Sequence, residues 1–243
     1  MDHFYRIIFE LGFPDITIYE HTRSILGVMC EAMEPLGLTE LAAIIGCDLT
    51  QVRTSLKPLQ TLLIQKNSTT EYKTIVSFEH VSLSQWLSDV DEGNQTPKAY
   101  PFEVDRKQAK EMICIWALAE AQKGQAHTWS YLARHLSYHL IDNERPAIIS
   151  ILLKEFDWIQ ARLQNTNINT LLDDFQIDGI SVDHDPVLML LQQAFKQSEQ
   201  VLMEEPNQLA SQLLGFLDPH SKFKEIQAIC YAAKKCINGH GIK

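Results

Sequence analysis

Two histidines four residues apart are the first candidates for chemistry in this chain. His135 and His139 fall on one face of a predicted helix, and zinc ligands often have this spacing. The residues between them are Leu-Ser-Tyr, so the glutamate of an H-E-x-x-H motif is absent, and no third ligand is identifiable nearby. We interpret both histidines as ordinary helix-face residues and predict no metal site.

Other arrangements typical of catalysis are also incomplete. Asp173 and Asp174 are adjacent, so on a helix their side chains point about 100° apart, whereas an acid/base pair needs convergent carboxylates. We interpret them as a solvated helix end. The sequence has no G-x-S-x-G elbow, no P-loop and no dinucleotide-binding glycine motif. We predict no catalytic residue and no cofactor. The alternative, a hydrolase or metal enzyme in the second half, predicts stoichiometric metal that His139→Ala would remove.

Composition indicates a globular chain that folds without crosslinks. It has 243 residues, 45% hydrophobic, and a formal net charge of −10, enough for one large or two modest domains. The cysteines form no C-x-x-C pair, and we interpret those in apolar helical contexts as reduced core residues: Cys30, Cys114 and Cys230, with Cys47 and Cys236 elsewhere. No apolar run approaches about 18 residues, and no basic region precedes an apolar stretch at the N-terminus. We therefore expect a cytoplasmic protein without a membrane span.

Helical periodicity organises the first half of the chain. Residues 17–33 predict a helix that Pro35 and Gly37 end, and 40–46 predict a second helix. Thr39 is the expected N-cap of that second helix, and Gly46 is expected to stop it.

A third helix and a short β-like stretch follow. Thr50 is the expected cap of the third helix, and Pro58 predicts a kink or a new turn within it. A strand is expected around Ile75 and Phe78, and a last helix follows. The apolar positions are Val52, Leu56, Leu59 and Leu63 in the third helix, and Leu83, Trp86 and Leu87 in the last. This order predicts a winged-helix domain with a small β-wing.

The charge of this predicted domain does not suit DNA. Residues 1–95 hold 6 Lys and Arg against 13 Asp and Glu, a formal charge of −7, and affinity for DNA comes mostly from cations that neutralise phosphates. We therefore expect protein contacts and no nucleic-acid partner. The alternative, a stand-alone nucleic-acid-binding regulator, would depend on the basic candidates Arg53, Lys57, Lys66 and Lys73.

A segment without periodicity separates this domain from a second one. Residues 90–101 gather Gly, Asn, Pro and charge, so we predict domains at 1–95 and 96–243. An ordered connector over this segment is an equally compatible alternative. Only helices are predicted beyond it, at 105–122, 128–141, 145–153, 155–164, 166–173, 186–203, 206–217 and 221–237. Their lengths and short links predict an irregular stacked-helix array. Its tryptophans are expected to pack in the core, the alternative being an exposed partner surface: Trp116, Trp129 and Trp158.

Stretches along nearly the whole chain, taken in order, match the pattern of a known family. They are 4–8, 13–15, 34–36, 38–42, 62–64, 77–87, 131–140, 156–163 and 205–215, together with Val52, Leu56 and Leu59. On these stretches the chain resembles the middle region of STAND-class signalling ATPases, the apoptotic protease-activating factor-like group with NACHT or NB-ARC cores. In that family a P-loop ATPase core is followed by a winged helix, a helical arm and a sensor array such as a WD-repeat propeller.

The resemblance implies a regulatory role without catalysis. It implies a scaffold module, either a split subunit or a truncated remnant, whose partners are a P-loop ATPase, a WD-repeat propeller or both. It also implies a role for His80, because a histidine there contacts the β-phosphate of bound ADP in the family. The usual Met-His-Asp is Glu79-His80-Val81 here, and the phosphate site belongs to a domain that this chain lacks. His80 is therefore expected either to sense ADP in a larger assembly or to be a relic or a capping residue.

Overall fold

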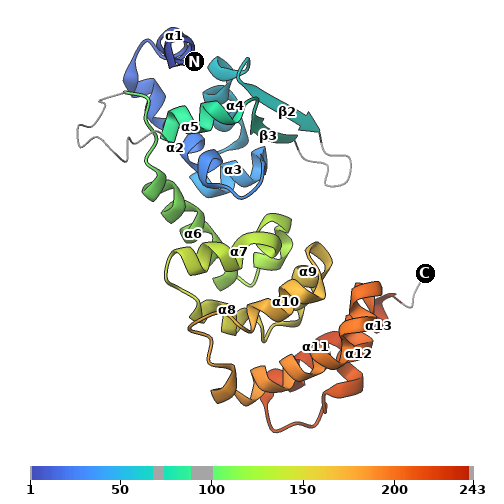
Figure 1. The fold of residues 1–243 in the computed structure, drawn as a ribbon. Helices are drawn as coiled ribbons and strands as arrows, with labels where there is room; N and C mark the ends of the chain where they lie inside the picture. Colours follow the sequence, from blue (N-terminus) through green and yellow to red (C-terminus); the bar gives the residue numbers. More distant parts are fainter. Residues whose placement is uncertain (1, 68–73, 89–100, 241–243) are drawn as a thin grey trace. The chain divides into compact units, whose positions relative to one another are not determined.

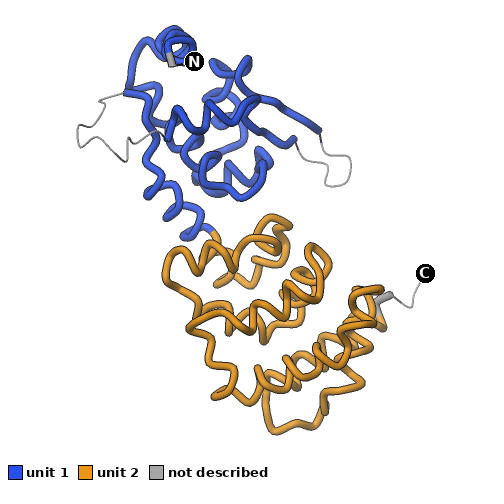
Figure 2. The backbone as a smooth tube through the Cα atoms, in the orientation of Figure 1, with its two compact units in different colours: residues 1–116 blue, residues 117–243 orange. Residues whose placement is uncertain are grey.

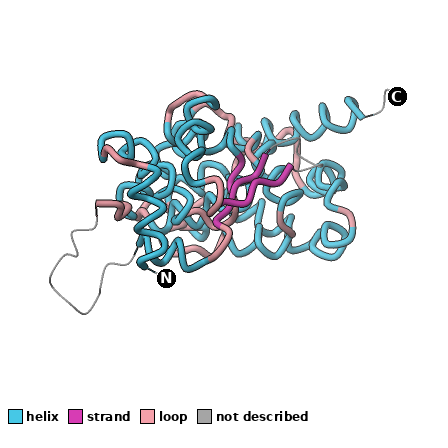
Figure 3. Tube along the Cα trace, turned by 90° about the horizontal axis from the view of Figure 1, so that it is seen from above, coloured by secondary structure: helices cyan, strands magenta, loops and turns pink. Residues whose placement is uncertain are grey.

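The chain is mainly helical, with one small antiparallel sheet (Figures 1 and 3). A computed structural model describes residues 2–67, 74–88 and 101–240. The chain divides into two compact units, 1–116 and 117–243 (Figure 2), and the division falls within α6 (Arg106–Gln122). The boundary predicted between residues 95 and 96 lies outside the described residues. Within the described ranges, no helix is both long and apolar enough to cross a membrane.

The first unit combines helices with all three strands of the sheet. The helices predicted over 17–33 and 40–46 are present with slightly shifted ends, whereas the first helix of the chain was not predicted. In order, the elements are α1 (Asp2–Gly12), α2 (Ile16–Glu31), β1 (Leu36–Gly37), α3 (Leu38–Ile45), α4 (Leu49–Leu56), the 3₁₀ turn η1 (Lys57–Leu59), β2 (Leu63–Asn67), β3 (Thr74–Phe78), α5 (Val81–Ser88) and the start of α6.

Carboxylates, not the predicted threonines, cap α3 and α4. The Gly37 N–H donates to Glu40 Oε2 at 2.6 Å, so α3 begins one residue before Thr39. Asp48 caps α4, because its Oδ1 accepts from the Gln51 N–H at 2.8 Å, and Thr50 already lies inside the helix. Both residue types satisfy the open N–H groups of a first turn. Gly46 ends α3 with φ +74°, as predicted.

The third predicted helix is shorter than its apolar spacing suggested. Pro58 lies in η1, directly after α4 ends, so the predicted new turn is confirmed. Leu63 and Ile64 were expected to continue the helix, but they begin β2. A proline cannot donate the next helical hydrogen bond, and the chain is then free to extend. The apolar side chains that follow are buried in the strand instead.

The sheet has the order β1-β3-β2, with all neighbours antiparallel. Its register pairs Leu36 with Val76 and Leu63 with Phe78. The expected strand around Ile75 and Phe78 is β3, while β2 and the two-residue β1 were not predicted individually. Alternation along β3 buries Val76 against the helices.

Aromatic rings join segments of the first unit that lie far apart in the sequence. Phe9 of α1 lies 5.0 Å from Trp86 of α5 and 5.3 Å from Phe102, measured between ring centroids. Tyr19 of α2 stacks edge-on to Phe102 at 5.1 Å, and its hydroxyl donates to the Phe102 carbonyl at 2.6 Å. Such ring pairs stabilise beyond their buried area. The aromatic cluster thus connects α1, α2, α5 and the segment before α6.

The second unit is a succession of helices, each packed against a neighbour in the sequence. The predicted helices are present, with ends shifted by up to about three residues. Beyond the end of α6 they are η2 (Ala126–Thr128), α7 (Ser130–Asp142), α8 (Ala147–Leu152), α9 (Phe156–Asn165), α10 (Ile168–Asp174), η3 (Val182–His184), α11 (Pro186–Glu204), η4 (Pro206–Gln208), α12 (Leu209–Phe216) and α13 (Lys224–His240). The last helix also packs against α9.

The second unit contains a buried ion pair between two of its helices. The Arg162 guanidinium of α9 donates to both carboxylate oxygens of Asp174 in α10, at 2.8 and 2.9 Å. Its remaining nitrogen donates to the carbonyls of Ala133 and Arg134 in α7, at 2.9 and 2.6 Å. Arg162 and Asp174 are both buried. One side chain therefore ties three helices together.

Candidate functional site

His80 immediately precedes α5 and is held by a short chain of hydroxyl groups. Its Nδ1 lies 2.6 Å from Ser82 Oγ and accepts from the Ser82 backbone N–H at 3.1 Å. Ser82 Oγ lies 2.7 Å from the hydroxyl of Tyr5 in α1. Because Nδ1 accepts from a backbone N–H, a neutral His80 ring carries its proton on Nε2. The imidazole is exposed, so Nε2–H is available as a donor to an anion.

The pair formed by Ser82 and His80 has the separation of a nucleophile and its base, but a different role explains it. A catalytic pair needs the base aimed at the hydroxyl and a third group that orients the base. Here the same imidazole nitrogen also accepts from the backbone of Ser82, which is how a side chain caps a helix N-terminus. The capping role predicted for His80 is therefore present, whereas the role as an ADP sensor stays a prediction.

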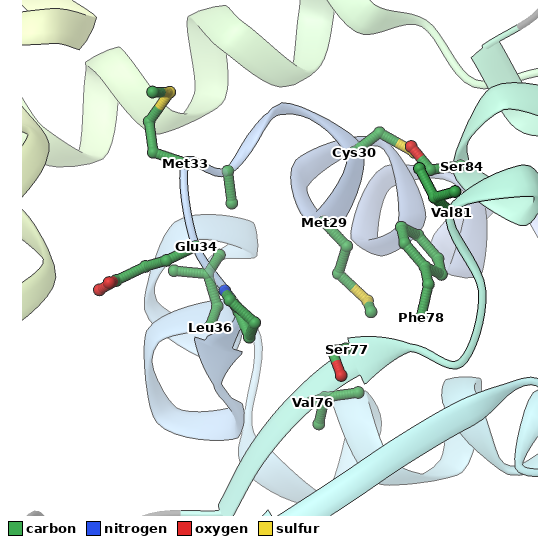
Figure 4. Close-up of a pocket in the computed structure, with 12 residues that line it drawn as sticks. Met29, Cys30, Met33, Glu34, Leu36, Val76, Ser77, Phe78, Val81 and Ser84 are labelled. Carbon is green, nitrogen blue, oxygen red and sulfur yellow. The ribbon is translucent and has the colours of Figure 1, made fainter.

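Beside this histidine, an apolar pocket opens between α2, the loop after it, β3 and α5. It has a volume of about 360 Å³. Figure 4 shows the side chain of Met29 beside the ring of Phe78, with Val81 near one end of that ring. Its lining residues are mostly apolar: Met29, Cys30, Ala32, Met33, Glu34, Pro35, Leu36, Val76, Ser77, Phe78, Val81 and Ser84. Sequence reasoning did not predict this pocket, because its walls come from segments up to about 50 residues apart.

Cys30 places a thiol in the wall of this pocket. Burial raises its pKa, and hydrogen bonds with Ser84 and Ser88 offset this only in part. The thiol form is therefore the ordinary one near neutral pH, and the nucleophilic thiolate is disfavoured. The expectation that Cys30 is a core residue is only partly correct, because it is half-buried, whereas Cys114 and Cys230 are buried. All five cysteines are free thiols.

The basic candidates for nucleic-acid binding do lie on the surface. Arg53 and Lys57, four residues apart in α4 and η1, are both exposed, and so is Lys66 on β2. Lys73 lies outside the described residues. Three scattered cations on an acidic unit make a weak attraction for a phosphate backbone.

The two histidines of α7 serve packing. His139 is buried, and its Nε2 lies 2.7 Å from the hydroxyl of Tyr131. The Tyr131 ring lies 5.1 Å from the His135 ring and 5.8 Å from that of His139, between centroids. In the part of the chain that the structure describes, no three His, Cys, Asp or Glu side chains gather in a way that could hold a metal ion.

The adjacent aspartates have separate environments, which corrects one prediction. Asp173 is exposed, as expected of a solvated helix end, but Asp174 is buried against Arg162. The prediction was wrong for Asp174 because its partner lies one helix earlier, and adjacency within α10 gives no sign of it. Their divergence still excludes an acid/base pair formed by these two carboxylates.

Two of the three tryptophans confirm the core interpretation. Trp116 and Trp158 are buried, while Trp129 is half-buried and its Nε1 donates to Glu120 Oε2 at 2.9 Å. Burial by itself raises the pKa of Glu120, but hydrogen bonds from Lys123 and Trp129 outweigh it and lower the pKa below its usual value. Trp129 thus anchors η2 to α6 rather than forming part of an exposed aromatic surface.

The outer face of α1 is the clearest apolar surface of the first unit. Phe4, Ile7 and Leu11 are 58%, 42% and 78% exposed, and their spacing places them on one side of the helix. The opposite side contributes Tyr5 and Phe9 to the core. The spacing of these three residues was a sequence signal for an amphipathic helix, but apolar residues on both sides of α1 obscure it.

A second hollow, of about 530 Å³, lies between α9 and α13 in the second unit. It is lined by Phe156, Asp157, Gln160, Tyr231, Ala232, Lys235 and Cys236. Asp157 and Lys235 give it charges of both signs, so it favours no single ligand class.

Comparison with known proteins supplies no relative, because no family model, no curated protein and no solved structure matches the chain.

Proposed function

We propose that the chain is a non-catalytic regulatory or scaffold module of a STAND-type signalling ATPase, either a separately encoded subunit or a truncated remnant. Its work is to make protein contacts, and the apolar outer face of α1 is the observation that carries this proposal. Phe4, Ile7 and Leu11 form a continuous stripe on a helix whose other side is already core. Exposed apolar stripes on folded proteins mark surfaces that a partner covers.

The order of elements in the first unit supports the winged-helix interpretation. A helix, a short strand, two helices and a two-stranded hairpin follow one another, and the sheet has the order β1-β3-β2. In the resemblance, residues 4–8 correspond to the link that leaves the ATPase core. The apolar face of α1 therefore lies where such a module is expected to meet its ATPase.

His80 has a defined place in this proposal. With Nδ1 occupied as a cap, Nε2–H is the group that could reach a nucleotide phosphate held by the partner ATPase. The chain alone then neither binds nor hydrolyses ATP. The helical second unit is the arm of the same module, and a WD-repeat propeller is its further candidate partner.

A second candidate function, nucleic-acid binding, is favoured by one observation. Arg53 and Lys57 share the exposed side of the helix that a winged-helix protein would insert into the major groove. The acidic balance of residues 1–95 opposes it. The two candidates predict opposite responses to salt and to substitution on different helices.

Complex formation with a P-loop ATPase, which we expect to be encoded beside this reading frame, tests the proposal. The chain alone is expected to show no ATP hydrolysis. Leu11→Lys in α1 is expected to weaken the complex at least about tenfold, because it places a charge in an apolar contact. Ile151→Lys is the matched control, because this exposed isoleucine is also the second-to-last residue of its helix.

Two results would count against the proposal. One is an ATPase complex that Leu11→Lys and Ile151→Lys affect equally. The other is salt-sensitive binding to duplex DNA that Arg53→Ala with Lys57→Ala abolishes, which would establish the nucleic-acid function instead.

A further inference from the structure

One edge of the sheet in the first unit is incomplete where it meets the apolar pocket. Strand β1 pairs with β3 only through Leu36 with Val76 and Gly37 with Ile75. On the other side β2 pairs along the whole of β3, from Thr74 to Phe78. Among the described residues, the last part of β3 therefore pairs with a strand on one side only.

The ladder fixes the direction of the backbone groups at this edge. The Glu79 N–H donates to the Leu62 carbonyl at 3.0 Å, which makes Glu79 and Leu62 a hydrogen-bonded pair. Antiparallel pairs alternate, so Ser77 also bonds toward β2 while Val76 and Phe78 face the opposite edge. Val76 meets β1 there. Phe78 turns its N–H and C=O toward a position that β1 does not reach.

The pocket lies beside this open position. Its walls include the Phe78 ring, Met29 and Leu36 (Figure 4). Val81 stands at its rim and is 65% exposed. Methionine side chains adapt to apolar groups of different shapes. An N–H and C=O pair beside an apolar hollow is the arrangement by which sheets take up an added strand and one of its side chains.

We propose that this edge binds an extended peptide segment of a partner protein, which adds to β3 at Phe78 and inserts one aliphatic side chain into the pocket that Met29 and Phe78 line. The inference rests on the proposed function, a module that makes protein contacts, but it uses a surface other than α1. The volume of about 360 Å³ accommodates a side chain of leucine or methionine size. Because residues 1–95 carry a formal charge of −7, lysine or arginine beside the aliphatic residue would favour association.

The N–H and C=O of Phe78 favour an added strand over other occupants of the pocket. A free apolar small molecule would fill the hollow without using the Phe78 N–H and C=O. A partner helix has its own backbone groups bonded internally and could not use them either. An extended segment satisfies both the edge and the hollow.

Peptides of about seven residues, an ordinary strand length, test the inference on the full chain. The probe alternates threonine and valine, with a central leucine and lysine at each end. Its analogues carry isoleucine, methionine, phenylalanine or aspartate at the centre. A further analogue is N-methylated at the central residue, which removes the donor that faces Phe78. Fluorescence anisotropy gives the affinity, and amide NMR shifts and hydrogen exchange of Phe78 report the contact.

An apolar peptide is expected to shift the resonances of Phe78 and the Met29 methyl group and to slow exchange of the Phe78 amide. Aspartate at the centre, N-methylation and Val81→Asp are each expected to weaken binding by about tenfold or more. Val81 is the first residue of α5, where aspartate favours the helix. Ile16→Asp is the matched control, because Ile16 is the exposed first residue of α2.

The inference is overturned if no aliphatic peptide shifts Phe78 or Met29 up to millimolar concentration, or if N-methylation and Val81→Asp leave the affinity unchanged. Failure here is distinct from failure of the proposed function. Leu11→Lys tests the ATPase contact and leaves the pocket intact, whereas Val81→Asp alters the pocket and leaves α1 intact.

Discussion

The two units are held together by different kinds of contact. In the first unit, aromatic rings from four segments meet around Phe9, and a buried hydrogen bond within that cluster joins the hydroxyl of Tyr19 to the Phe102 carbonyl. In the second unit, whose core is otherwise largely apolar, a buried ion pair joins three helices: Arg162 bonds Asp174 and two carbonyls of α7. We therefore expect that removing a buried polar group lowers the free energy of unfolding less in the first unit than in the second.

The helices around the ion pair of the second unit are short. Helices α8, α9 and α10 have 6, 10 and 7 residues, so a large share of their backbone groups lies in terminal turns. A guanidinium can satisfy several acceptors from three elements at once. The first unit instead joins elements distant in sequence, where large rings cover the most surface per residue.

Removing the guanidinium should produce the largest effect. Arg162→Met is expected to lower the free energy of unfolding by about 3–5 kcal/mol, because Asp174 becomes a buried carboxylate without its partner. Urea denaturation measures the loss, and hydrogen exchange should locate it in residues 117–240. Arg162→Met with Asp174→Leu should recover most of it, since neither charge is then left buried. A loss of the same size in the double variant would mean that packing, not charge, decides.

Removing the polar link of the aromatic cluster should matter less. Tyr19→Phe keeps the ring against Phe102 and is expected to cost about 1–2 kcal/mol, because a buried carbonyl loses its donor. The same denaturation experiment measures it, with exchange quickened in α1 and α2. A cost equal to that of Arg162→Met would contradict the contrast between the units.

The smallest effect is expected at the start of α11, and it depends on pH. Partial burial raises the pKa of Asp185, but hydrogen bonds from Lys154, Leu188 and Val187 outweigh it and hold the pKa below its usual value. The ionised carboxylate is thus the stabilising form. Its contribution is present above the unfolded-chain pKa of about 3.9 and is lost as the pH falls through the lower folded pKa.

Asp185→Asn sharpens this last expectation. Asparagine is also a good N-cap, so the variant loses mainly the half-exposed ion pair with Lys154, about 0.5 kcal/mol. Thermal unfolding of both proteins between pH 2 and pH 7 should show a difference at neutral pH that disappears in acid. A difference that persists at the lowest pH would show that the cap geometry, not the charge, was altered.

The sequence predicted elements better than it predicted sites. Apolar periodicity placed the helices of the second unit to within about three residues, and the helix predicted from residue 186 is α11, which begins at Pro186 after the N-cap Asp185. Leu63 was misplaced because helical and strand burial look alike over a few residues. Asp174 and the apolar pocket were missed because each depends on partners from other elements. The sequence did single out His80. Its hydrogen bond with the backbone N–H of Ser82, two residues later, is a local contact that a sequence pattern can anticipate.

The reaction rates of two buried cysteines can report separately on how often each unit opens. Cys114 in α6 belongs to the first unit and Cys230 in α13 to the second, and both are buried. A buried thiol reacts with an alkylating reagent only while its surroundings are open. The alkylation rates of these two residues in the unaltered chain therefore report how often each unit opens, and whether the two openings share one rate.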